Sequence, residues 1–245
     1  MKHTLLIIVA LVVCFKSQAQ LSKGRMMLSG SFNYSKNYAA TTDTGVYAQQ
    51  PINNSNSFTG TIRYGYFVTD KIAVGVYGSY THSGNNSNSN YFNGTTHLVQ
   101  TSNRTANNFS AGVFSRYYQM LGKSRFALFG ELFAGYGMGK QEQKVTSLDP
   151  AGNLVTTNSH SDLSSINLGF NPGLVFFVTK HLAIETTFGS AGFSAQRSKN
   201  YSPNQYNETK NSTFNTNLGL SISRFTWGVN FYFGGKKEKT EVPTK

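Results

Sequence analysis

The chain has 245 residues and a formal net charge of +12, yet only 13% of its residues are charged. Apart from the KKEK run at 236–239, its Lys and Arg residues are scattered, which argues against a nucleic-acid interface and fits a position beside an anionic membrane or lipopolysaccharide surface. After residue 15 no apolar run is long enough for a transmembrane helix.

The N-terminus has the features of an export signal. Lys2 gives a positive start, an apolar run follows from Leu5 to Phe15, and small residues precede the expected cut between Ala19 and Gln20. An alternative makes Cys14 the cysteine of a lipoprotein, but Val13 is large for the position before it. Cleavage after Ala19 removes the only cysteine, which excludes disulfides and thiolate metal sites in the mature chain.

Strict polar/apolar alternation, which is typical of β-strands with one apolar face, dominates the rest of the chain. Between the strands no stretch has a helical period. We expect eight strands, each long enough to cross a bilayer at a tilt, at 25–35, 57–68, 71–83, 108–118, 125–139, 165–178, 181–193 and 224–233.

Short and long connections alternate between these strands. The phrase YFVTDKIAV at 66–74 returns as FFVTKHLAI at 176–184, and each copy predicts a tight turn between two strands. A third tight turn is expected near Gly122. The long connections are expected at 37–56, 84–104, 140–161 and 194–211, although turn signals at Asn93–Gly94 and Asp149–Asn153 predict that two of them continue as hairpins. This alternation favours an all-β, eight-stranded antiparallel up-and-down transmembrane β-barrel, with short turns in the periplasm and long loops outside.

The two faces of the strands differ in size. Large apolar residues lie on one face, and the other is largely Gly, Ser, Thr, Ala and Asn, so we expect the first face to contact lipid and the second to fill a narrow lumen. The inward parity also includes Arg63, Arg116, Glu131 and Glu185. Because isolated buried charges are costly, these four should pair, either as a structural polar plug or as part of a gated, selective pore.

Aromatic residues are expected at the membrane interfaces and on the last strand. The predicted interfacial set is Tyr64, Tyr66, Tyr117, Tyr136, Trp227 and Tyr232. The last strand alternates with apolar residues at Phe225, Trp227, Val229, Phe231 and Phe233. Residues upstream of it have the opposite parity, which predicts a break near Ser223–Arg224.

The export signal, the alternating strands, the phrase GYFVTDKIAVG and the terminal GVNFYF resemble the small outer-membrane β-barrel (porin-like) family of Bacteroidetes-type bacteria, similar in form to OmpX, OmpW and the OmpA membrane domain. The resemblance implies localisation in the cell outer membrane, and it implies that the last strand is an assembly signal read by the barrel-insertion machinery. The expected organisation is a signal peptide at 1–19, a barrel at 20–234 and a disordered periplasmic tail at 235–245. Unlike many members, this chain continues beyond the terminal aromatic residue.

The sequence offers little support for catalysis. His82-Ser83 and His160-Ser161-Asp162 contain the residue types that lipid A-modifying barrel enzymes use, but neighbours on a strand point to opposite faces. No spacing of a metal or cofactor site is present. We therefore expect a structural or adhesin-like role, in which polar loops contact an extracellular ligand or surface partner, with outer-membrane lipid and lipopolysaccharide around the barrel. A narrow passive channel for small solutes or hydrophobic molecules is the alternative, and lipid A modification a remote one.

Overall fold

The computed structural model describes residues 21–40, 52–92, 97–122, 124–149, 152–203, 205–218 and 226–235. The expected signal peptide and its cleavage site, the expected break near Ser223–Arg224, Phe225, and residues 236–245 of the expected tail lie outside these ranges. Among the described residues, no helix is long and apolar enough to cross a membrane.

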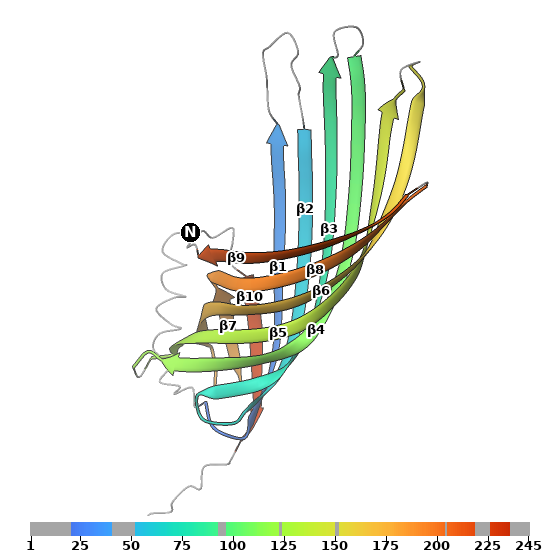
Figure 1. The fold of residues 1–245 in the computed structure, drawn as a ribbon. Coiled ribbons are helices and arrows are strands. Elements are labelled where there is room, and N and C mark those ends of the chain that lie inside the picture. Colours follow the sequence, from blue (N-terminus) through green and yellow to red (C-terminus); the bar gives the residue numbers. More distant parts are fainter. Residues whose placement is uncertain are drawn as a thin grey trace, which may run out of the picture.

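Ten strands form one antiparallel sheet that closes on itself (Figure 1). Consecutive strands pair from β1 to β7, β6 also pairs with β8 and β8 with β9, and β10 closes the ring by pairing with both β7 and β1. β7 and β8 both pair with β6, so they are two parts of the seventh strand of an eight-stranded ring, and β9 and β10 belong to the eighth. The strands are β1 (Arg25–Ala40), β2 (Ile52–Phe67), β3 (Ile72–Phe92), β4 (His97–Met120), β5 (Phe126–Leu148), β6 (Leu154–Phe177), β7 (Leu182–Thr187), β8 (Gly189–Ser202), β9 (Gln205–Leu218) and β10 (Thr226–Gly234).

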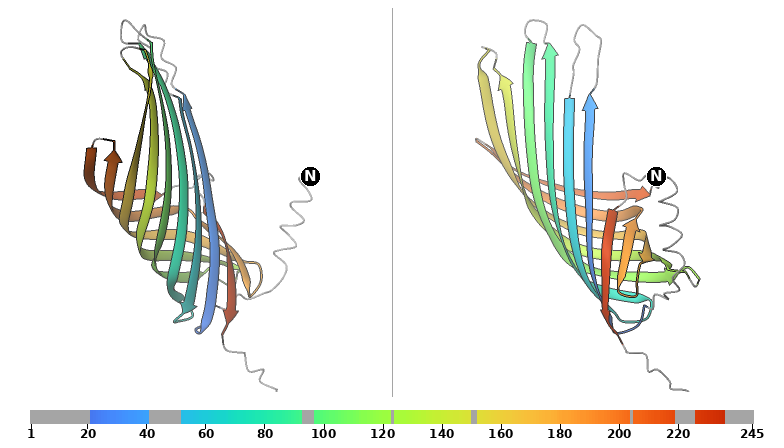
Figure 2. Two further views of the ribbon diagram at one scale, coloured as in Figure 1. Left: turned by 90° about the vertical axis from the view of Figure 1, so that its right-hand side faces the viewer. Right: turned by 180° about the vertical axis from the view of Figure 1, so that it is seen from behind.

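The strands are longer than the sequence predicted. Most residues of the four expected long loops are strand, since β3 and β4 remain paired as far as Phe92 and His97, and β8 and β9 as far as Ser202 and Gln205. The extension of β3–β4 and β5–β6 agrees with the hairpins that the two turn signals predicted. The expected loop at 194–211 was wrong in most of its length, and so were the described parts of the loop at 37–56. The reason is that the hydrogen bonds of a ladder come from the backbone, so a partner strand can extend it through Asn, Ser and Thr residues, which give no apolar alternation. Hairpins β1–β2, β3–β4 and β5–β6 rise side by side above the ring (Figure 2).

The repeated phrase forms the same tight turn twice, as predicted. In the first copy Val68 N donates to Ile72 O at 3.0 Å, and the Thr69 hydroxyl accepts from the amides of Lys71 and Ile72. In the second copy Thr179 plays the same role, because its hydroxyl accepts from the amides of His181 and Leu182. Each Thr thus satisfies two amides that the ladder leaves free.

The seventh strand is interrupted where a continuous strand was expected. β7 ends at Thr187, β8 begins at Gly189, and Phe188 N donates to Pro172 O at 3.2 Å. Between the pairs Gly173–Thr187 and Phe170–Ala191, three residues oppose two, which is a bulge that reverses the side-chain parity. The side-chain parity also differs between the two parts of the eighth strand. Even-numbered Phe214 on β9 and odd-numbered Trp227 on β10 are both exposed.

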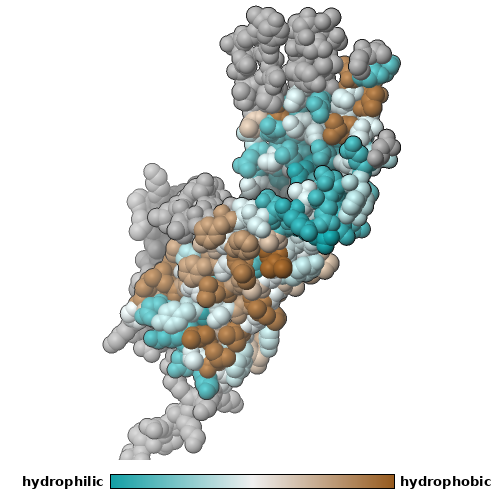
Figure 3. Space-filling model, in the orientation of Figure 1, coloured by the Kyte–Doolittle hydropathy of each residue, from teal (hydrophilic) through white to brown (hydrophobic). Residues whose placement is uncertain are grey.

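Large apolar side chains cover the outside of the ring. Outward residues of every strand of the ring are exposed, for example Ile62, Val76, Leu132, Ile184 and Phe231. In Figure 3 this apolar surface forms a broad band over the lower part of the molecule, and hydrophilic residues gather over the projecting hairpins. The band is the expected lipid-facing surface, and the hairpins extend beyond it.

Candidate functional site in the barrel lumen

Arg116 lies at the centre of the lumen, where it contacts two carboxylates. Its Nη2 is 2.5 Å from Glu131 Oε2, its Nη1 is 2.5 Å from Glu185 Oε2, and its Nε donates to Glu131 Oε2 at 3.0 Å. Arg116 is 0% exposed and Glu131 is 1% exposed. The three residues come from β4, β5 and β7, so the contact joins strands on different sides of the barrel.

Arg63 on β2 completes a network of two cations and two anions. Its Nε lies 3.2 Å from Glu131 Oε2, and its Nη1 donates to Ser31 Oγ at 3.0 Å. The structure thus brings together the four lumen charges named from parity, and we call Arg63, Arg116, Glu131 and Glu185 the charge network. Their formal charges cancel, so attraction between the partners offsets part of the desolvation cost of burying them.

Neutral side chains also donate hydrogen bonds to both carboxylates of the charge network. Asn230 Nδ2 donates to Glu185 Oε2 at 2.7 Å, and Ser29 Oγ donates to Glu185 Oε1 at 3.3 Å. Asn171 Nδ2 donates to Glu131 Oε1 at 3.4 Å. A buried polar network of this kind is stable only when its members are paired, so these contacts hold the two glutamates in fixed positions.

A cluster of buried apolar residues fills the lumen next to the charge network, mostly on the side of the tight turns. Arg116 contacts both the charge network and this apolar cluster. Its guanidinium lies 4.3 Å from the ring centre of Phe129 and donates to the Tyr118 hydroxyl at 3.3 Å. All eight strands of the ring contribute to this apolar plug, which consists of Met27, Phe67, Ala73, Phe114, Tyr118, Ala127, Phe129, Val175, Phe177, Ala183 and Tyr232.

Sequence reasoning missed the plug because it treated the inward face as small and polar. The signal was present, since the inward positions next to the tight turns, such as Phe67, Tyr118 and Phe177, are large and apolar. Tyr232 was also misplaced as an interfacial aromatic residue. It is 1% exposed inside the lumen, because it alternates with the outward Phe231 and Phe233.

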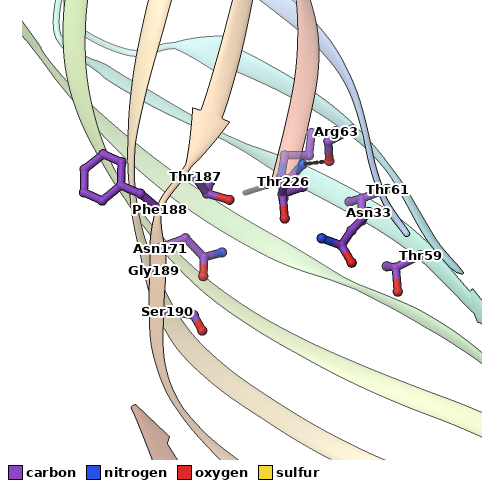
Figure 4. Close-up of a pocket in the computed structure, with 11 residues that line it drawn as sticks. Asn33, Thr59, Thr61, Arg63, Asn171, Thr187, Phe188, Gly189, Ser190 and Thr226 are labelled. Atoms are coloured by element: carbon purple, nitrogen blue, oxygen red, sulfur yellow. Dashed lines mark hydrogen bonds between the residues drawn. The ribbon is translucent and has the colours of Figure 1, made fainter. Parts of the chain in front are cut away.

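On the hairpin side of the charge network the lumen opens into a polar cavity of about 200 Å³. Figure 4 shows Arg63 and the hydroxyls of Thr59 and Thr61 on one side, with Asn171 and Thr187 among the residues lining the cavity. Arg63 is the member of the charge network that lines this cavity, and the other lining residues are mostly neutral hydrogen-bonding groups.

The other aromatic residues named from the sequence lie on the outside. Tyr64, Tyr66, Tyr117, Tyr136 and Trp227 are all exposed. Tyr136, however, is in the middle of β5 and not near its end, because β5 continues to Leu148. On β10 the residues Trp227, Val229, Phe231 and Phe233 all face outward, as the alternation of the last strand requires.

The histidines of the candidate catalytic pairs contact other groups. His82 Nδ1 is 2.7 Å from Asn107 Oδ1, and the His160 ring stacks on Tyr201 with centroids 4.8 Å apart. Ser161 Oγ donates to Asn200 Oδ1. Within the described ranges, no group of His, Cys, Asp and Glu has the arrangement of a metal site.

Comparison with protein families decides the class of this barrel. The family model of the outer membrane protein beta-barrel domain matches residues 5–221. The chain belongs to this family. Membership places it in the outer membrane, as the predicted fold required. The more specific resemblance to Bacteroidetes-type members stays a prediction.

Comparison with solved structures found similar outer-membrane proteins at low sequence identity. The structure is similar to OprG from Pseudomonas aeruginosa, with 15% identity over 89% of this chain and 99% of that one and a TM-score of 0.46. It is also similar to Neisserial surface protein A (14% identity, 86% and 98% covered, TM-score 0.35) and to Ail, the attachment invasion locus protein of Yersinia pestis (16%, 86% and 99%, 0.29). Comparison with curated protein sequences gave no match.

Proposed function

We propose that this protein is a closed, non-catalytic barrel that acts through its projecting hairpins at the cell surface. The observation that carries the proposal is the contrast between the filled ring and the long hairpins that project from it. The charge network and the apolar plug fill the ring, while β3 and β4 have 21 and 24 residues, about twice the 9–11 that cross a bilayer. The extra length serves no purpose in spanning the membrane, so it is available for contact outside.

The composition of the hairpins suits a contact surface. Hairpin β3–β4 carries Asn86, Asn88, Asn103 and Thr105 at outward positions, and exposed Asn, Ser, Thr and Tyr side chains adapt their hydrogen bonds to many partners. Cross-strand pairing holds these side chains on a rigid ladder and not on a loose loop, which lowers the entropy that binding must overcome.

A shortened hairpin tests the surface role. Residues 84–105 are replaced by an Asn-Gly turn that joins the cross-strand partners Ser83 and Ala106. Cells that display the intact protein should aggregate or attach to glycan-coated and abiotic surfaces more than cells with the shortened one. Heat-modifiable migration in detergent gels checks that both variants fold. Equal attachment by the two would contradict a role for this hairpin.

A narrow channel is the second candidate, and the polar cavity above Arg63 is the feature that favours it. On our proposal the purified protein gives no discrete conductance steps in planar bilayers, because the apolar plug lies below that cavity. Steps that appear with the wild type and disappear when Arg116 is replaced would instead favour the channel.

Absence of catalysis and export by a cleaved signal peptide complete the proposal. Overexpression should leave the mass spectrum of lipid A unchanged, whereas a shifted mass would show that the barrel is an enzyme. The N-terminus of protein purified from outer membranes should be Gln20, and a lipid-modified Cys14 would support the lipoprotein alternative.

A further inference from the structure

The outer face of β5, β6, β8 and β9 is ordered in rows that cross all four strands. The register places residues of the four strands side by side, and successive outward rows are about 6.6 Å apart along a strand. From the middle of the apolar band toward the hairpin tips, the rows are Ala134, Leu168, Phe193 and Phe214; Tyr136, Ile166, Ala195 and Ser212; Met138, Ser164, Arg197 and Lys210; Lys140, Asp162, Lys199 and Glu208; and Glu142, His160, Tyr201 and Tyr206.

An apolar groove lies at the lower end of these rows. It has a volume of about 610 Å³, and its outward walls are Val113, Leu132, Leu168, Phe170, Phe193 and Phe214. The small side chains of Ala134 and Ala191 lie between these large ones, which creates the depression. The groove is on the lipid-facing side of the barrel, and its size and chemistry suit a hydrocarbon chain.

Cationic side chains gather two and three rows above the groove. Arg197 Nη2 lies 2.7 Å from Glu208 Oε2, and Lys210 Nζ lies 3.5 Å from Glu208 Oε1. Lys199 is the cross-strand neighbour of Glu208 and of Asp162. On β8 and β9 three cations therefore surround one carboxylate, which leaves a local excess of positive charge at the upper edge of the apolar band.

The row above the cations is aromatic. His160 stacks on Tyr201 at an interplanar angle of 13°, and Tyr201 contacts Tyr206 with centroids 5.3 Å apart. Tyr206 is exposed, and its hydroxyl donates to Glu208 at 3.4 Å, which fixes the ring. An exposed aromatic face beside fixed carboxylate and amide groups can hold a sugar ring through its C–H groups.

We propose that this face binds a phosphorylated glycolipid of the outer leaflet, such as lipopolysaccharide. The order of the rows matches the order of groups in such a molecule, with an acyl chain in the groove, a phosphate at Arg197, Lys199 and Lys210, and sugar against Tyr206. The face formed by β2, β3 and β4 has no such order, because the outward residues that continue the row of Lys140 across it are Asn107, His82 and Phe58, none of which is Lys or Arg.

Binding of lipid A to the detergent-solubilised full-length protein tests the proposal, with native mass spectrometry as the measurement. We expect bis-phosphorylated lipid A to bind at least about tenfold more tightly than its phosphate-free form, since charge-assisted contacts are the strong ones. The triple variant Arg197→Gln, Lys199→Gln, Lys210→Gln should lose that difference, and Ala134→Phe, which narrows the groove, should weaken binding of both forms.

Lys36→Gln is the matched control, because Lys36 is an exposed cation on β1, which β2, β3 and β4 separate from β5 along the sheet. It should bind lipid A as the wild type does, and all variants should show heat-modifiable migration. A triple variant with wild-type affinity, an equal loss in Lys36→Gln, or equal binding of phosphatidylglycerol would each overturn the proposal. The result does not depend on the attachment assay, because the glycolipid site lies beside the membrane and not on the shortened hairpin.

Discussion

Arg116 shows what sequence reasoning supplies at the level of single residues. Alternation along each strand was enough to place Arg116, Glu131, Glu185 and Arg63 on the inward face. It did not reveal that Arg116 contacts both glutamates while Arg63 contacts only one of them. That arrangement depends on how the strands are staggered around the ring, which a single sequence does not show.

Replacing Arg116 should destabilise the barrel strongly. Arg116→Ala leaves Glu131 and Glu185 buried with less positive charge, and breaking a buried ion pair from one side typically costs about 3–5 kcal/mol. Arg63→Gln should cost less, because its side chain is 12% exposed and Glu131 keeps its contact with Arg116. The unfolding free energy in urea, measured in lipid vesicles, checks both, and equal losses would contradict the central role of Arg116.

The pairing of Glu208 predicts a pH dependence in hairpin β8–β9. Hydrogen bonding from Arg197 lowers the pKa of Glu208 below its ordinary value of 4.5, and the nearby cations act in the same direction. Because the pKa of Glu208 is lower in the folded protein than in the unfolded chain, its ionised carboxylate stabilises the hairpin at pH values above the ordinary pKa. This stabilisation is lost as the pH falls through the pKa that Glu208 has in the folded protein. Amide exchange of β8–β9 should therefore accelerate below about pH 4.5 more than intrinsic exchange does. Glu208→Gln should remove this additional change, and an unaltered profile in that variant would contradict the assignment.

At the level of elements, the repeated turns and the extended hairpins β3–β4 and β5–β6 were predictable, whereas the extension of β1–β2 and β8–β9 was not. A Thr followed by two polar residues between apolar strands is a local signal, and both copies fold in the same way. Strand extension into the polar hairpins depends on a partner strand, since Asn-rich and Ser-rich sequence has little strand preference of its own. The bulge at Phe188 likewise appears only once β6 and the seventh strand are paired.

The two turn threonines should contribute equally to stability. Thr69→Ala and Thr179→Ala each remove one hydroxyl that accepts from two amides, at distances of 3.0 to 3.2 Å. Each change should cost about 1 kcal/mol, and the double variant about the sum, because the turns are separate. Ser at either position keeps the hydroxyl and is the control. If Thr→Ser costs as much as Thr→Ala in the same unfolding assay, the hydroxyl is not responsible.

At the scale of the whole molecule, closure of the ring by β10 determines whether a barrel forms. β10 pairs with β1 from Arg25–Gly234 to Phe32–Trp227 and also with β7, so it closes the ring over its own length. Closure matters because an unpaired strand edge in the hydrocarbon region is costly. Its Tyr232 enters the apolar plug while Phe231 and Phe233 face lipid. The last strand therefore contributes to the apolar plug, to the lipid-facing surface and to the closure of the ring.

Changing the outward aromatic residues of β10 should reduce insertion into the outer membrane. The double variant Phe231→Ala, Phe233→Ala keeps Tyr232 in the plug but removes the terminal aromatic pattern that our assembly hypothesis requires. The amount of heat-modifiable protein in isolated outer membranes should fall several-fold. Phe109→Ala with Phe126→Ala is the matched control, since both are outward and exposed on other strands. Equal losses in the two double variants would indicate a general loss of lipid contact and contradict an assembly signal.

The sequence by itself determined the fold class, the outward and inward faces and the tight turns, because these follow from period-two alternation and from local turn chemistry. Only the tertiary structure decided the contacts of Arg116, the extension of hairpins β1–β2 and β8–β9 and the rows that cross β5, β6, β8 and β9. The physical reason is that these features depend on register. Alternation says which face a side chain occupies, but pairing between strands decides which side chains become neighbours on that face.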